Sequence, residues 1–498
     1  MHVMHNMLFG FQVALQPVNL LYCLMGTLIG TMVGVLPGLG PAAAIALLLP
    51  TTFQASPVSA TIMLAGIYYG AMYGGSTTSI LVNIPGEAAS VVTCLDGYQM
   101  ALKGRAGPAL GIAAFGSFIA GTFGVVALSV TGPILSGVAL KFGPPEYFSM
   151  MIVGITVLTY LSSGSMVKAL LMAATGLILG GVGVDTISGK YRFTYGIEVL
   201  TDGLGLVPVV MGLFGIAEVL ENLEKEIKRD ILSAHIDHLL PNLQDWKDSS
   251  GPIARGTILG FFLGLVPGGG AIIASFASYA MEKKLAKHPE EFGHGAIQGV
   301  AGPESANNSA ASGNFIPLLT LGIPCNAVMA ILLGALMIHG LQPGPLLMTR
   351  APDLFWGTIV SMYIGNVMLL VLNLPLIGLW VKVLKIPYYL LYPLILLFCL
   401  IGSYSLNNNA AEVVIMLIFG VVGYLMRKFR YDGAPLILAL VLGPMLEEAF
   451  RQSLMLSKGD FSIFVSRPLS LAFLITAVLL LVIPVVTQRK KLSTLEEE

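Results

Sequence analysis

The chain has 498 residues, of which 55% are hydrophobic and only 11% are charged, with a formal net charge of −1. Soluble domains carry about 25% charged residues, so this composition predicts an integral membrane protein. The net charge excludes the basic surface typical of nucleic-acid binding, and the four scattered cysteines indicate neither a zinc site nor a disulfide framework.

The apolar segments predict an all-α polytopic membrane protein. Because about 20 apolar residues cross a bilayer, we expect roughly 10–12 transmembrane segments. Several segments are long enough for two short helices, and others are short for a full crossing. The candidate segments are residues 19–50, 58–85, 107–137, 146–182, 203–220, 253–281, 309–338, 353–384, 387–402, 411–426, 434–446 and 465–487.

The first predicted element carries a glycine- and proline-rich pattern that occurs twice. Residues 26–45 read GTLIGTMVGVLPGLGPAAAI, and residues 256–275 read GTILGFFLGLVPGGGAIIAS, at a constant offset of 230 positions. Long internal repeats are a signature of the fold. An apolar segment interrupted by Pro-Gly-x-Gly predicts a broken helix, which is tolerated at bilayer depth only beside protein or a water-filled cavity. Paired broken segments indicate the binding site of a transporter.

The repeat continues into two polar regions. Residues 74–88 read GGSTTSILVNIPGEA and residues 313–327 read GNFIPLLTLGIPCNA, with an Ile-Pro pair in common. The offset has grown to 239 positions because the second half carries an insertion. We therefore divide the chain into a first membrane repeat (1–220), a polar inter-repeat linker (221–252), and a second membrane repeat with C-terminal helices (253–498).

The distribution of basic residues predicts that the two repeats have inverted topology. Lys283, Lys284 and Lys287 follow the second broken segment, whereas an uncharged loop follows the first. Conversely, Lys103 and Arg105 lie at a loop of the first half whose counterpart has no Lys or Arg. By the positive-inside rule, equivalent loops face opposite sides of the membrane. The broken segments are then broken helices or re-entrant hairpins whose tips meet near the midplane.

The Pro-Gly-x-Gly tips are the first candidate substrate site. Glycines turn tightly and direct backbone N–H groups at an anion, and a helix that resumes after the break presents its positive end. The alternative is close helix packing, which we favour for Gly26, Gly30 and Gly34. We assign substrate binding to the tip residues Pro37, Gly38, Gly40, Gly268, Gly269 and Gly270.

Two polar clusters complete the candidate site. Amides and hydroxyls can donate to a carboxylate, and their oxygens can ligate Na⁺; the alternatives are helix capping and interhelical hydrogen bonds. Three tyrosines, Tyr68, Tyr69 and Tyr73, are equally compatible with lining the same cavity and with helix packing. We assign substrate binding to Ser76, Thr77, Asn307, Asn308 and Ser309, and a coupling-ion role to Asn83, Glu87, Glu304 and Ser312.

For two charged residues, a structural role is an alternative to a role in binding. Glu304 follows Gly302-Pro303, so it could simply start a helix. Arg192 lies in the polar stretch DTISGKYRFTYG, where an interfacial anchor is favoured over a carboxylate contact.

Several motifs, in order along nearly the whole chain, resemble the large membrane subunit of the tripartite tricarboxylate transporters. They are LPGLGP, YYGAMYGGSTTSILVNIPGEA, RFTYGIEVLTDGLGLVPVVMGLFGIAEVLE and GPESANNSAASGNFIPLLTLGIPCNA. The resemblance implies bacterial inner-membrane uptake of a carboxylate by Na⁺ or H⁺ symport, with no cofactor. It also implies two partners, a small membrane subunit and a periplasmic solute-binding protein. Cys325 departs from the glycine expected by analogy with Gly86.

Other interpretations stay open at this point. The carried solute is citrate, another tricarboxylate, a dicarboxylate or an aromatic acid, and the chain forms a monomer or a homo-oligomer. A channel-like permease or exporter that uses no binding protein is the alternative function. An intramembrane enzyme has little support, since no catalytic or nucleotide-binding motif is present. The transport motion is either elevator-like, with a moving site, or a rocking of two halves.

Overall fold

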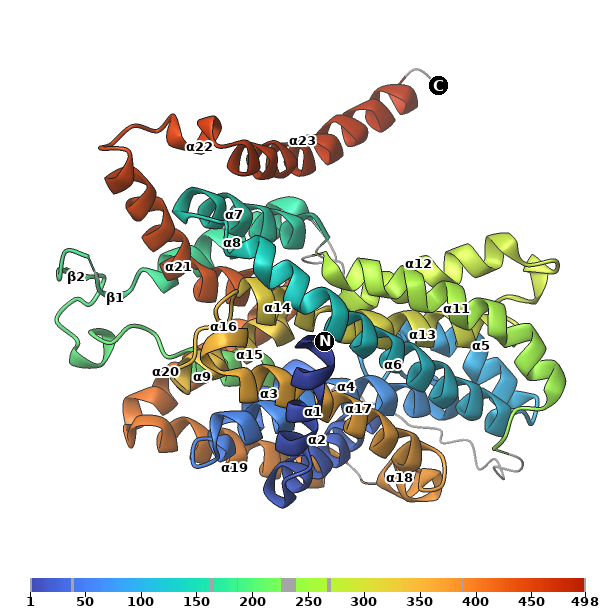
Figure 1. The fold of residues 1–498 in the computed structure, drawn as a ribbon. Helices are drawn as coiled ribbons and strands as arrows, with labels where there is room; N and C mark the ends of the chain where they lie inside the picture. The colour runs from blue at the N-terminus through green and yellow to red at the C-terminus, as the bar shows by residue number, and fades with distance from the viewer. Residues whose placement is uncertain are drawn as a thin grey trace.

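A computed structural model describes residues 2–36, 40–161, 165–185, 187–224, 239–266, 270–384, 386 and 388–496, and it is almost entirely helical (Figure 1). The all-α prediction is thereby confirmed. The helices of the first half are α1 (His2–Ala14), α2 (Pro17–Val35), α3 (Pro41–Leu48), η1 (Leu49–Thr52), α4 (Pro57–Val82), η2 (Ala88–Ser90), α5 (Val91–Leu102), α6 (Ala106–Ala139), α7 (Pro144–Leu161), α8 (Met166–Gly180), η3 (Glu198–Leu200), α9 (Leu206–Val210), the π-helical turn η4 (Met211–Ile216) and α10 (Ala217–Glu224).

The described residues of the second half are also almost entirely helical. Its helices are α11 (Leu243–Leu265), α12 (Gly270–Leu285), η5 (Pro289–Glu291), α13 (Gln298–Gly313), α14 (Phe315–Leu321), α15 (Ala327–Ile338), α16 (Leu347–Arg350), α17 (Pro352–Asn373), α18 (Ile377–Leu384), α19 (Tyr388–Asn407), α20 (Ala410–Lys428), α21 (Ala434–Leu456), α22 (Ile463–Ser466) and α23 (Pro468–Glu496). In the described part of the chain, the strands are β1 (Gly183–Val184) and β2 (Tyr191–Arg192), which pair antiparallel.

Five of the described helical segments are long and apolar enough to cross a membrane. They are Pro17–Val35, Ala106–Ala139, Leu206–Glu224, Pro352–Asn373 and Ala410–Lys428. Shorter apolar helices accompany them, as expected when spans are broken. The chain is therefore a multi-pass membrane protein, and the number of crossings stays a prediction. Part of the predicted linker, residues 225–238, lies outside the described residues.

Both predicted breaks separate two helices. α2 ends at Val35 and α3 begins at Pro41, while α11 ends at Leu265 and α12 begins at Gly270. Figure 1 places the β1–β2 hairpin at one end of the molecule, and α5 and the end of α12 at the other.

Glycines fix how the helix before each break packs. A Cβ at Gly30 would lie 2.6 Å from the carbonyl oxygen of Ile67 on α4, and Gly26 and Gly34 approach α4 equally closely. In the second half, a Cβ at Gly260 would lie 2.2 Å from the carbonyl oxygen of Ala306 on α13. Spacing by four residues puts such glycines on one helix face, so the backbones come into direct contact. The packing role favoured for the first three glycines is confirmed.

The other face of α2 is apolar and outward. Leu21, Leu24, Leu28 and Met32 are exposed, at the spacing of one helix stripe. Polar side chains such as Thr27 and Thr31 are buried instead and bond to backbone carbonyls one turn earlier. A polar interior with an apolar exterior is what a lipid environment selects.

Candidate functional site

A cavity of about 440 Å³ lies between the helices that resume after the two breaks. Gly40, Pro41, Ala42 and Ala43 line it from the first half, and the second half contributes residues 270–273. The two sets are 230 positions apart, as in the sequence repeat. α3 and α12 both begin at this cavity, so two helix N-termini meet there.

A second pair of segments lines the same cavity at the 239-position offset. Glu87 and Ala88 come from the first half, and Asn326 and Ala327 from the second. Both polar residues cap a helix: the Glu87 carboxylate accepts the Ala89 N–H at 2.6 Å, and the Asn326 side chain accepts the Met329 N–H at 2.9 Å. The local structure of the two halves is therefore repeated at the cavity.

The helices that precede these caps also end alike. α4 is followed by the C-cap Asn83, whose φ is 58°, and α14 by the C-cap Gly322, whose φ is 72°. A left-handed residue at this place ends a helix and turns the chain sharply. Asn83, a predicted ion ligand, thus acts here as a helix C-cap.

The two caps are held by reciprocal contacts between the halves. Asn307 donates to the Glu87 carboxylate at 3.2 Å, and Asn326 donates to the hydroxyl oxygen of Tyr68 at 3.3 Å. Tyr68 and Asn307 are themselves 239 positions apart. Asn314 also donates to Tyr68, at 2.8 Å. A contact between positions i and j that recurs between j and i is the pattern of a two-fold axis.

Glu304 is a buried carboxylate on α13 and is not among the described residues that line the cavity. It accepts hydrogen bonds from the hydroxyls of Ser76, at 2.6 Å, and Thr93. Its side chain therefore ties α13 to α4 and α5. The alternative interpretation, that Glu304 starts a helix, is wrong, because α13 begins at Gln298.

The remaining polar candidates face neighbouring helices. Asn308 donates to Ser117 of α6 at 2.7 Å, Ser309 to the Thr257 carbonyl at 2.7 Å, and Ser312 to the Gly121 carbonyl at 3.3 Å. Thr77 is buried within α4. In the described structure these four residues are not among those that line the cavity.

Of the tip residues, the structure describes Gly40 and Gly270, and both line the cavity. Gly270 has a φ of 37°, a conformation that other L-residues rarely adopt. The predicted site residues Pro37, Gly38, Gly268 and Gly269 lie outside the described residues.

A third wall of the cavity comes from regions that the sequence pattern did not single out. Phe214 and Glu218 belong to η4 and α10, and Arg427 and Asp432 lie at and beyond the end of α20. Arg427 pairs with Glu218 and, at 2.9 Å, with Glu221. A basic cluster at the end of an apolar segment, here Arg427, Lys428 and Arg430, resembles an ordinary interfacial anchor. The sequence therefore gives no signal that Arg427 faces a cavity.

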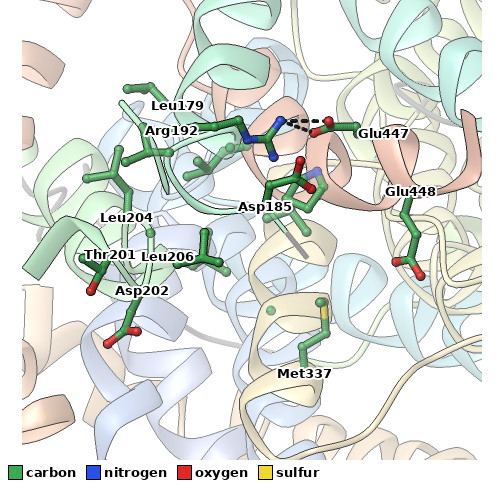
Figure 2. A pocket seen from close by; sticks show the side chains of 18 of the residues that line it. Leu179, Asp185, Arg192, Thr201, Asp202, Leu204, Leu206, Met337, Glu447 and Glu448 are labelled. Atoms are coloured by element: carbon green, nitrogen blue, oxygen red, sulfur yellow. Dashed lines mark hydrogen bonds and ion pairs between the residues drawn. The ribbon is translucent and has the colours of Figure 1, made fainter. Parts of the chain in front are cut away.

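A second cavity, of about 490 Å³, lies beside the β1–β2 hairpin. Figure 2 shows Arg192 reaching Glu447, with Asp185 beside the pair. Arg451 joins Asp185 at 2.8 Å and Glu447 at 2.6 Å. Hydrogen bonds from the Ser188 hydroxyl and the Ile187 N–H, together with Arg451, hold the pKa of Asp185 well below its usual range. Arg192 therefore ties the hairpin to α21; its location at the membrane interface stays a prediction.

The comparisons with known proteins agree with the resemblance. The family model described as the tripartite tricarboxylate transporter TctA family matches residues 20–438. An uncharacterized 52.8 kDa protein in the TAR-I ttuC' 3'region of Agrobacterium vitis is 51% identical over 501 residues, which cover the whole of both chains. An uncharacterized protein in the TAR-II ttuC' 3'region of the same organism is 50% identical over 242 residues, which are 48% of this chain and all of that one. No solved structure matches.

Proposed function

Because the chain belongs to the tripartite tricarboxylate transporter TctA family, we propose that it is the permease subunit of a binding-protein-dependent secondary transporter in the bacterial inner membrane. It takes up tricarboxylates such as citrate, or related carboxylates. Its partners are a small membrane subunit and a periplasmic solute-binding protein. Members of this family are transporters rather than enzymes.

The observation that carries this proposal is the cavity lined by corresponding residues of both halves. The N-termini of α3, α12 and α15 all border it. Helix N-termini carry partial positive charge and unpaired N–H groups, so their convergence favours a bound anion. The substrate carboxylates therefore bind between the two glycine-containing tips.

The charge of the lining supports cation symport. Among the described residues, Glu87, Glu218 and Asp432 are acidic and Arg427 is basic, for a formal charge of −2. An anion enters such a cavity at low cost only if cations or protons accompany it. Glu87 and the buried Glu304 are the carboxylates we assign to this coupling, which uses Na⁺ or H⁺.

Inverted topology is supported by the positions of the loops. The Lys103 ammonium donates to the His294 carbonyl at 2.5 Å, so the two lysine-bearing loops are neighbours. Their counterparts are neighbours as well: the rings of Phe53 and His339 lie 6.5 Å apart. The positive-inside rule places the lysine-bearing pair in the cytoplasm. The other pair then faces the periplasm, beside the β1–β2 hairpin.

Uptake of radiolabelled citrate in proteoliposomes that hold all three components tests the function. We expect uptake only with the binding protein present, and only with an inward gradient of Na⁺ or of H⁺, which ion substitution distinguishes. Uptake that needs neither the binding protein nor a gradient would instead identify a channel-like permease.

A further inference from the structure

We propose that Arg427 is a specificity-determining residue that exchanges Glu218 for one carboxylate of the transported anion. The inference rests on the proposed function of the cavity and adds to the helix N-termini a second anion contact in the same cavity. A substrate with several carboxylates then binds at both contacts, whereas a monocarboxylate occupies one.

Arg427 is placed to meet a ligand. It lies in the last turn of α20, lines the cavity, and keeps 27% of its side chain exposed. It is the one basic side chain among the described residues that line this cavity. Its recorded ion pairs, to Glu218 and Glu221, both use Nη1. A guanidinium has five N–H donors, so the remaining N–H groups of Arg427 can donate to a carboxylate in the usual bidentate geometry.

Glu218 is suited to release Arg427. Its side chain also lines the cavity and is 12% exposed. The Asn222 amide donates to its other carboxylate oxygen at 2.9 Å. Glu218 therefore retains a partner when the guanidinium turns to the substrate, which lowers the cost of breaking the pair.

The surrounding backbone holds this pair at the cavity. Phe214, in the π-helical turn that precedes Glu218, lines the cavity too. Such turns occur frequently at functional sites. A Cβ at Gly212 would lie 2.4 Å from the Met416 carbonyl oxygen, so η4 and α20 are in direct contact. Arg427 and Glu218 thus face each other from two tightly joined helices.

Equilibrium binding to the full-length protein in lipid nanodiscs tests the proposal, with tricarballylate, glutarate and butyrate as probes. These acids carry three, two and one carboxylates on similar carbon chains. We expect affinity for the parent protein to rise with each carboxylate. The two steps in affinity are from butyrate to glutarate and from glutarate to tricarballylate. Arg427→Gln should reduce the gain in affinity at one of these steps by about 10- to 100-fold, the effect of losing a charge-assisted hydrogen-bonded contact. The other step should stay within about threefold, the spread typical of such measurements.

Matched variants exclude a purely structural role. Lys428→Gln removes the same charge one residue away; Lys428 pairs with Glu224 and does not line the cavity, so all three affinities should match the parent. Glu218→Gln keeps the shape of the side chain but weakens its hold on Arg427. It should therefore strengthen binding at the step that Arg427→Gln weakens.

The outcomes separate this inference from the proposed function. If the parent prefers the acids with more carboxylates and both Arg427→Gln and Glu218→Gln retain that preference in full, Arg427 only joins helices and the inference fails alone. If the parent binds none of the three acids, or all with equal affinity, the carboxylate site itself is wrong and the inference fails with it.

Discussion

Asn307 and Asn308 are adjacent in the chain, yet α13 directs them to different partners. Asn307 donates to Glu87, which lines the cavity, whereas Asn308 donates to Ser117 on α6. Consecutive helical residues point about 100° apart, so neighbours in sequence seldom share a site. Of these two adjacent amide side chains, Asn307 therefore contacts a residue of the cavity wall, and Asn308 joins two helices.

We expect Asn307→Ala to lower apparent substrate affinity more than Asn308→Ala does. Losing the donor to Glu87 removes a hydrogen bond to a charged group, which is typically about 1.5–3 kcal/mol, or roughly 10- to 100-fold. Uptake kinetics in the reconstituted system, with equal amounts of folded protein, measure this. Equal kinetics for Asn307→Ala and the parent would place the substrate elsewhere.

Asp185 makes the hairpin sensitive to acid. Its pKa is lowered in the folded state by the Ser188 hydroxyl, the Ile187 N–H and Arg451. The ionised form is therefore preferred in the folded hairpin, and its contribution is complete above the unfolded pKa of about 4. It is lost as the pH falls from there through the lower, folded-state pKa.

A spin label at position 195, on the exposed Tyr195, reports this transition. We expect the label to be ordered at neutral pH and to become mobile only as the pH falls through the folded-state pKa of Asp185, well below about 4, because protonated Asp185 holds Arg451 less strongly. In Asp185→Asn the label should be more mobile throughout and change little with pH. A parent protein whose label is already as mobile at neutral pH as the label in Asp185→Asn would contradict this role.

At the scale of elements, the glycine stripes set the distance between helices. Gly30 meets α4 and Gly260 meets α13 through backbone carbonyl oxygens, which have no freedom to move aside as a side chain would. Each stripe fixes one helix before a break, and so fixes the start of α3 or α12 at the cavity.

Gly30→Ala and Gly260→Ala should each destabilise the protein. A Cβ within 2.6 Å or 2.2 Å of a carbonyl oxygen forces the helices apart, and overpacking of this kind typically costs about 1–3 kcal/mol. Thermal unfolding in detergent measures the change. Gly137→Ala on α6 is the matched control: nothing lies within 4 Å of its Cβ position, so it should be neutral or slightly stabilising.

At the scale of the whole molecule, the reciprocal contacts and paired loops are consistent with a two-fold axis in the membrane plane. We expect single cysteines at 51–57 and at 283–291, in a cysteine-free background, to react with impermeant reagents from opposite sides of intact membrane vesicles. Labelling of both segments from the same side would exclude inverted repeats.

The transport motion is the second property of the whole molecule. We propose that the tips carry the site across the membrane against a fixed remainder in an elevator-type motion, since two breaks supply two gates. Spin labels at Gly40 and in residues 465–482 measure the distance between the tip and that segment. This distance should change when substrate and ion are added, because the tip changes its depth in the membrane. A tip that keeps its depth relative to that segment would favour rocking of two halves.

Much of the site followed from the sequence where its signal is local. Gly40 and Gly270 can be identified from the sequence because glycine and proline act on their own backbone, and both line the cavity. Glu87 can be identified as an acidic residue beside a polar cluster, and it lines the cavity too. The prediction of Asn308, Ser309 and Ser312 rests on side-chain chemistry alone. Polar side chains serve a site and a helix interface equally well, so chemistry does not tell which of the two they occupy.

By itself, the sequence determined that this is a helical membrane protein of a transporter family, with two breaks and a repeat at fixed offsets. Composition, periodicity and turn chemistry are carried by neighbouring residues, so they can be read along the chain. Only the tertiary structure decided that Tyr68, Asn326 and Arg427 meet the tips at one cavity. These residues lie more than 100 positions apart, and their meeting depends on how helices pack rather than on any local pattern.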